Sequence, residues 1–258
     1  LPAMDSEVAS EFKKSLEKQG IEFKLSHKVI AAKSGSKDVE VTMESEKDKK
    51  QTTDKFNIVL MSIGRKPNTE GLNLEKIGIK LNDQKFIEVN KHFKTSIGNI
   101  YAIGDVVPGP MLAHKAEEEG VACVEIIKGQ KAYLNYDNIP AIVYTSPEVA
   151  SVGKTEEQLK ESDINYSVGK FPFMANGRAL TTSASDGFVK ILVNKKTDSI
   201  LGAHIIGHDA GQLIAEIVTA MEFGGSAEDI ARICHAHPTT SEAVKEAALS
   251  VDGKAIHI

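Results

Sequence analysis

Two apolar runs decide the fold of the last part of this chain: Phe188-Val-Lys-Ile-Leu-Val-Asn194 and Ile200-Leu-Gly-Ala-His-Ile-Ile206. Both have the length and the Val, Ile and Leu content of strands. Three shorter runs precede them at Ala141–Tyr144, Val149–Val152 and Tyr166–Phe171. We therefore predict an antiparallel sheet in this region.

Helices are predicted between and after these strands. Thr155-x-x-Gln158 and Ser226-x-x-Asp229 fit the capping pattern that starts a short helix. Ala210–Phe223 is a longer, apolar helical stretch. This mixture of strands and helices predicts an α+β domain.

The stretch His235-Ala-His-Pro-Thr-Thr-Ser-Glu242 sets two histidines and a carboxylate just before a further predicted helix. An imidazole on rigid backbone, supported by a carboxylate, suits proton transfer near neutral pH. The same residues also fit a capping box, in which Glu242 only satisfies a backbone N–H. Both interpretations remain open on the residues alone. Ser241 lies inside the capping turn, which disfavours a hydrolase nucleophile.

The first part of the chain predicts a helix followed by strands. Met4–Gln19 is amphipathic and stops at Gly20. Strands are predicted next at Ile21–Leu25, His27–Ala32 and Asp38–Met43. The charged run Glu44–Lys50 then predicts a solvated hairpin tip.

Two further strands are predicted to end at ligand-facing turns. Asn57–Ile63 is almost continuously apolar, as in a strand covered on both faces, and it ends at Gly64. Asn99–Asp105 ends in Gly-Asp. Such an Asp can accept hydrogen bonds from sugar or ribitol hydroxyls, although an ordinary turn also explains it. A helix predicted over Pro108–Lys128 follows, and its N-terminal N–H groups suit a polar or partly negative ligand edge.

Composition narrows the class of protein. The chain has 258 residues, 41% hydrophobic residues and a net charge of -5, which gives no electrostatic reason to expect nucleic-acid or anionic-membrane binding. No apolar run approaches the roughly 20 residues of a membrane span, and no export signal is expected. Cys123 and Cys234 form no metal-ligand pattern, so we expect no metal and two small buried hydrophobes in a reducing compartment.

Six stretches, in this order, carry a family resemblance: Ile63-Gly-Arg-Lys-Pro-Asn68, Tyr101-Ala-Ile-Gly-Asp105, Pro110-Met-Leu-Ala-His-Lys115, Tyr144-Thr-Ser-Pro-Glu-Val149, Gly169-Lys-Phe-Pro-Phe173 and His235-Ala-His-Pro-Thr239. They resemble the flavin-dependent pyridine nucleotide–disulfide oxidoreductases. The Met-Leu-Ala-His-Lys and His-Ala-His-Pro-Thr stretches together favour the branch that oxidises dihydrolipoamide with NAD+.

The family's N-terminal features are missing. A complete member has a G-x-G-x-x-G fingerprint for FAD, a C-x-x-x-x-C redox pair and a second glycine fingerprint for NAD, and this chain contains no G-x-G at all. The resemblance implies a C-terminal portion that is inactive alone and does not retain FAD. By the same resemblance, the chain is expected to contain the remainder of a Rossmann-type NAD domain (1–66), a central domain completing the FAD site (67–135) and an α+β dimerisation domain (136–258).

The resemblance also implies roles for individual residues. His237 matches the catalytic base and Glu242 its partner, whereas His235 is expected to be structural. Asp105 matches the residue that holds the FAD ribitol. The helix start facing the flavin ring corresponds to Met111, Leu112, Ala113 and His114, and the NAD contacts to Gly64 and Val29.

Partners follow from the same resemblance. Members are homodimers in which the histidine acts on the disulfide of the other subunit, and Ala210–Phe223 is expected in that interface. They dock onto the acyltransferase cores of 2-oxoacid dehydrogenase complexes, which implies the mitochondrial matrix. Two alternatives stay open: a non-catalytic dimerisation or binding module, and a related flavin disulfide reductase with another substrate.

Overall fold

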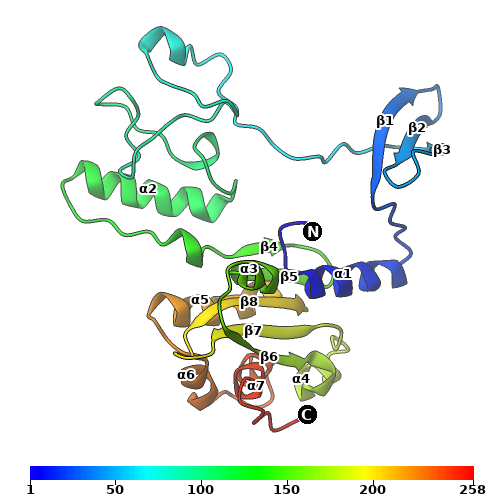
Figure 1. Cartoon of the computed structure of the whole chain (residues 1–258), viewed down its shortest axis with the longest axis vertical. Coiled ribbons are helices and arrows are strands. Elements are labelled where there is room, and N and C mark those ends of the chain that lie inside the picture. The colour runs from blue at the N-terminus through cyan, green and yellow to red at the C-terminus, as the bar shows by residue number, and fades with distance from the viewer.

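The computed structural model describes residues 1–258, and Figure 1 shows three parts. The first part holds helix α1 (Ser6–Lys18) and an antiparallel sheet of β1 (His27–Ser34), β2 (Val39–Ser45) and β3 (Gln51–Phe56). The sheet stands apart from the remainder of the molecule (Figure 1). Among the helices, none has the length and hydropathy needed to cross a membrane.

Helix α1 confirms the predicted amphipathic helix but packs far from its neighbours in sequence. The Asp5 side chain caps it by accepting the Glu7 N–H at 3.1 Å. Its buried Val8 packs against Val149, Phe188 and Ile206, which belong to the sheet of the last part. The first helix of the chain therefore lies on the last domain (Figure 1).

Two predicted strands are absent. Ile21–Leu25 and Asn57–Ile63 form no ladder. The apolar side chains of the second stretch lie in solvent, with exposed fractions of 85% for Ile58, 85% for Leu60 and 90% for Ile63. A strand forms only where a neighbour accepts its backbone hydrogen bonds, and the β1-β2-β3 sheet offers none to this stretch. The prediction of a buried strand at Asn57–Ile63 was wrong, because no neighbouring strand or helix covers this apolar stretch.

The middle part has one long helix, α2 (Ala113–Ile127). Its small core consists of Leu74, Ile79, Ile87, Ala102 and Val107. The strand predicted to end at Asp105 is reduced to one bridge between Lys94 and Tyr101. Helix α2 begins later than predicted because Gly109 has φ +120°, a conformation that cannot continue a helix.

The last part confirms all five predicted strands. They are β4 (Ala141–Val143), β5 (Glu148–Gly153), β6 (Tyr166–Pro172), β7 (Phe188–Asn194) and β8 (Ile200–Gly207), in the antiparallel order β4-β5-β8-β7-β6. The helices are α3 (Glu156–Glu161), α4 (Gly177–Thr181), α5 (Ala210–Glu222), α6 (Ala227–Arg232) and α7 (Glu242–Ser250). Capping boxes start α3 at Thr155 and α6 at Ser226, as predicted.

Strand β7 is buried on both faces, and its alternating residues serve two different layers. Val189 and Ile191 join a cluster of 21 residues with α5, α6 and α7. Phe188 packs toward α1 on the other face. Lys190 lies in the same strand and is only 1% exposed, so a charged side chain must be accommodated in this core.

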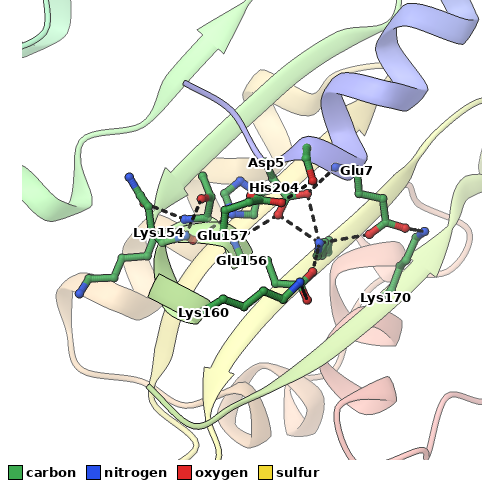
Figure 2. Close-up of polar contacts among 12 residues, drawn as sticks. Asp5, Glu7, Lys154, Glu156, Glu157, Lys160, Lys170 and His204 are labelled. Carbon is green, nitrogen blue, oxygen red and sulfur yellow. Dashed lines mark hydrogen bonds and ion pairs between the residues drawn. The ribbon is translucent and has the colours of Figure 1, made fainter. Parts of the chain in front are cut away.

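Lys190 is held by three carboxylates, those of Asp5, Glu7 and Glu156, which are labelled in Figure 2. Its Nζ lies 3.1 Å from both oxygens of Asp5, 3.1 Å from Glu7 and 2.6 Å from Glu156. Burial alone would raise the pKa of Glu156, but hydrogen bonds from Lys190, Lys160 and Tyr166 hold it at about 2. The network joins α1, α3 and β7.

This network makes the free energy of unfolding depend on pH in the acidic range. The folded pKa of Glu156 is about 2 and its ordinary value is 4.5, so its contribution is present above about pH 5 and is lost as pH falls toward 2. We expect Glu156→Gln to remove roughly 2 kcal/mol of that pH-dependent stability, measured by urea denaturation across this range. Glu161→Gln, an exposed change on the same helix, should leave the acid profile unchanged. If the free energies of unfolding of wild type and Glu156→Gln changed with pH in the same way, this account would be contradicted.

Gly169 allows α7 to lie directly on β6. A Cβ at this position would come within 2.1 Å of the Ala247 carbonyl oxygen and 2.6 Å of the Val251 side chain. We expect Gly169→Ala to lower the free energy of unfolding by about 2–3 kcal/mol in urea denaturation, because the helix must move away. Gly177→Ala is the control, since nothing lies within 4 Å of its Cβ position. Equal stability of the two variants would contradict this packing argument.

Candidate functional site

His237 and Glu242 form a hydrogen-bonded pair at the start of α7. The Nδ1 of His237 lies 2.9 Å from Glu242 Oε1. The other carboxylate oxygen accepts the Thr239 N–H at 2.8 Å. Glu242 therefore satisfies a backbone N–H and orients the imidazole at once. The predicted capping box is only half formed, because α7 has Ser241 as its N-cap and no side chain caps the helix.

The geometry leaves one histidine nitrogen free for chemistry. Because the carboxylate accepts at Nδ1, the proton of the neutral ring lies there and Nε2 carries the lone pair. The His237 side chain is 71% exposed, whereas Glu242 is 19% exposed. Burial would raise the pKa of Glu242, but the Thr239 N–H and His237 lower it. The pair is a proton acceptor facing outward, supported by a fixed negative charge.

Tertiary contacts hold this pair in place. Ala243, Val244 and Ala247 of α7 are fully buried in the main core. The loop before α7 is fixed by Asn176, a buried residue whose side-chain amide donates to the Thr239 carbonyl at 3.0 Å. Asn176 was missed from sequence, because its partner is 63 residues away.

The neighbouring candidates do not join the pair. His235 is bound to Glu216 of α5 through Nε2 at 2.7 Å, in line with its expected structural role. Ser241 contacts Thr239 and no histidine, so no nucleophile–base pair exists there. Cys234 is exposed and only Cys123 is buried, so the expectation that both are buried was wrong.

A second region surrounds the Gly104-Asp105 turn. Gly104 has φ +73°, and a Cβ there would meet the Ala116 side chain of α2 at 3.2 Å. The Asp105 side chain is 48% exposed and receives a hydrogen bond from Arg65 Nη1 at 3.2 Å. The other arm of Arg65 donates to the Met111 carbonyl. Arg65 was not predicted as a site residue, although it follows Gly64 in one of the matching stretches.

The start of α2 completes this region. Leu112 is the N-cap but provides no side-chain cap, and the first turn has no acidic residue. The N–H groups of Ala113, His114 and Lys115 therefore lack a partner within the helix. The His114 ring instead bonds to the Pro140 carbonyl at 2.8 Å, so only its backbone faces the turn.

The remaining predicted residues lie apart. Gly64 is exposed with φ +127° and is connected to Asp105 through Arg65. Val29 is 59% exposed in β1, away from α2 (Figure 1). The pair on α7 and the turn beside α2 also lie in different parts of the chain (Figure 1). No group of three or more His, Cys, Asp or Glu side chains is arranged to hold a metal ion.

The residues of the turn fit a flavin nucleotide. An acceptor carboxylate suits ribitol hydroxyls, and unpaired N–H groups at a helix start suit an electron-rich ring edge. The missing Cβ of Gly104 lets the turn that carries Asp105 lie close to Ala116 of α2. This fit depends on the residues beside α2 and not on any bound group.

Comparisons with known proteins bear on both regions. The family model of the pyridine nucleotide-disulphide oxidoreductases matches residues 1–120, and the model of their dimerisation domain matches residues 139–248. The chain belongs to the pyridine nucleotide-disulphide oxidoreductase family. The His237–Glu242 pair lies within the matched dimerisation domain, and the Asp105 turn lies within the first match.

Individual members are similar over the whole chain. The mitochondrial dihydrolipoyl dehydrogenase of Pisum sativum is 53% identical over 258 residues, 100% of this chain and 52% of its own length. That of Sus scrofa is 53% identical over 98% of this chain and 50% of its own length. Among solved structures, LpdA from Mycobacterium tuberculosis has a TM-score of 0.86 at 27% identity, covering 95% of this chain and 52% of that one. The chain thus spans about half the length of these family members.

The double role of Glu242 has a measurable effect on stability. We expect Glu242→Ala to lower the free energy of unfolding by about 1–2 kcal/mol at pH 7, because Thr239 N–H and His237 both lose their partner. The loss should shrink as pH falls below about 4.5, where the lowered pKa of the folded carboxylate stops favouring the native state. Glu228→Ala, an exposed first-turn change on α6, should cost less than about 0.5 kcal/mol. Equal losses would contradict the capping role.

Proposed function

We propose that this chain is the C-terminal portion of a dihydrolipoyl dehydrogenase, which oxidises dihydrolipoamide to lipoamide and reduces NAD+. The observation that carries the proposal is the His237–Glu242 pair, with its free Nε2 facing outward. Support comes from the names of relatives that are about 53% identical over this chain.

His237 would act as the base. A thiolate is the nucleophile in thiol–disulfide exchange, so a dihydrolipoamide thiol must first lose its proton. The proton passes to Nε2 of His237, and the thiolate attacks one sulfur of a disulfide supplied outside this chain. A mixed disulfide forms, the old S–S bond breaks, and the other sulfur leaves as a thiolate. Glu242 keeps Nδ1 as the donor and stabilises the imidazolium that forms.

The turn beside α2 would hold the flavin. We assign Asp105 to ribitol hydroxyls and the Met111, Leu112, Ala113 and His114 backbone to the ring edge. FAD, when bound, supplies electron transfer between the dithiol couple and NAD+. Gly64 and Val29 are proposed NAD contacts, and Val29 has the weaker support because it lies apart.

The proposed active site needs two subunits. Within one chain, His237 and Asp105 belong to different parts (Figure 1), and residues 139–248 match a dimerisation domain. We propose a homodimer in which His237 serves the disulfide of the partner subunit. The domain boundaries proposed from the resemblance, at about residues 66 and 135, fit this arrangement. Acyltransferase cores of 2-oxoacid dehydrogenase complexes are the proposed partners, in the mitochondrial matrix.

The 258 residues alone are proposed to be inactive. The two cysteines lie in different parts of the structure, Cys123 buried on α2 and Cys234 exposed after α6, so they form no redox pair. A purely non-catalytic dimerisation module remains the second candidate, and the intact, outward-facing His237–Glu242 pair disfavours it.

The base assignment is tested in the longer protein that includes the flavin domain. We expect His237→Gln to lower dihydrolipoamide turnover by about 10²–10⁴-fold, because a positioned base is removed. Flavin absorbance should be unchanged. The control is His208→Gln, another exposed histidine beside a carboxylate, Asp209. Near-normal turnover of His237→Gln would overturn the assignment.

A further inference from the structure

Helix α2 contains a charged pair that is shut off from water. Lys115 Nζ and Glu119 Oε1 lie 3.0 Å apart, and their side chains are 0% and 1% exposed. The two acidic residues that directly precede Glu119 on the helix, Glu117 and Glu118, are exposed. A buried ion pair is stable only when further hydrogen bonds satisfy both ions. The other hydrogen bonds of Lys115 and Glu119 therefore identify the part of the chain that this pair positions.

Both polar groups of Gly104 are bound by the pair. Glu119 Oε2 accepts the Gly104 N–H at 2.7 Å, and Lys115 Nζ donates to the Gly104 carbonyl at 3.3 Å. With φ +73°, Gly104 belongs to a tight turn and not to a strand ladder. Its backbone is therefore held by side chains of α2, immediately before Asp105.

Lys115 also shapes the loop that leads from Asp105 to α2. A Cβ at Gly109 would lie 3.0 Å from Lys115 Cε. The aliphatic stem of the lysine thus packs directly under this loop. One ion pair supports both the turn that carries Asp105 and the approach to the helix start.

Tyr136 provides a further hydrogen bond to Glu119. Its hydroxyl donates to Glu119 Oε1 at 2.8 Å. Burial and then Glu119 raise the pKa of Tyr136 well above its ordinary value, so it remains a donor at neutral pH. Tyr136 lies between α2 and β4, where the chain enters the last domain.

We propose that Glu119, assisted by Lys115 and Tyr136, is a positioning residue that holds the Asp105 carboxylate and the start of α2 in register for the ribityl chain of a flavin. The inference rests on the flavin assignment proposed above. Asp105 itself is half-exposed, and its side-chain partner, Arg65, is 62% exposed. The rigidity of this site therefore comes from the buried side of the turn.

The positioning role is tested on the 258-residue chain by amide hydrogen exchange measured with NMR. We expect Glu119→Gln to speed exchange of the Gly104 amide by about tenfold or more, because the buried Lys115 ammonium loses its counter-ion and the side chains that hold the turn must rearrange. The Ile87 and Ala102 amides, which bond to Val106 and Phe93, should keep their protection. Glu118→Gln is the matched control on the exposed side of α2. The neutral pair Lys115→Met with Glu119→Gln should restore most of the protection, since the glutamine oxygen can still accept.

The outcomes separate a positioning role from a structural one. Unchanged Gly104 exchange in Glu119→Gln, or equal losses at Gly104, Ile87 and Ala102, would overturn the proposal. If Glu119→Gln does not fold, Tyr136→Phe provides the same test, with an expected increase at Gly104 of about threefold.

A second measurement addresses the ligand. In the longer protein, the Kd of the apo form for FAD, followed by flavin fluorescence, should rise at least about fivefold in Glu119→Gln and recover in the neutral double variant. An unchanged Kd would overturn the positioning role. Failure of the wild type to bind FAD would instead overturn the proposed function, while the Gly104 exchange still decides whether Glu119 holds the turn.

Discussion

Burial of both faces of the β7–β8 pair is the constraint on which most of this structure depends. Helices α5, α6 and α7 cover one face with a continuous apolar core, and α1 covers the other. Neither strand has a solvent side, so each residue needs a partner within the protein. This requirement draws the first helix of the chain onto a sheet made by its last half.

Two buried lysines show how the same requirement applies to charge. Lys190 in the sheet is matched by Asp5, Glu7 and Glu156, and Lys115 on α2 is matched by Glu119. Leaving either ion unpaired in a dry interior would cost several kcal/mol. Each network therefore fixes the position of the elements that supply its members, α1 and α3 in one case and the Gly104 turn in the other.

The His237–Glu242 pair depends on the sheet in a less direct way. Glu242 is positioned because α7 lies tightly on β6 at Gly169, and the loop that carries His237 is fixed by buried Asn176. A hydrogen-bonded pair with one exposed and one largely buried member thus rests on rigid elements. Such support is what proton transfer requires, since a base must be held at a fixed distance from its proton donor.

The sequence by itself determined the local features and the family. These features depend on residues that are close together in the sequence. Examples are the alternation of the strands in the last part, the capping boxes at Thr155 and Ser226, and the spacing of His237 and Glu242. Only the tertiary structure decided which partners meet: Lys190 with Asp5, 185 residues away, Arg65 with Asp105, and the exposure of Asn57–Ile63 and Cys234. Periodicity shows that a side chain or strand is suited to burial, but a neighbour distant in sequence must be present to bury it.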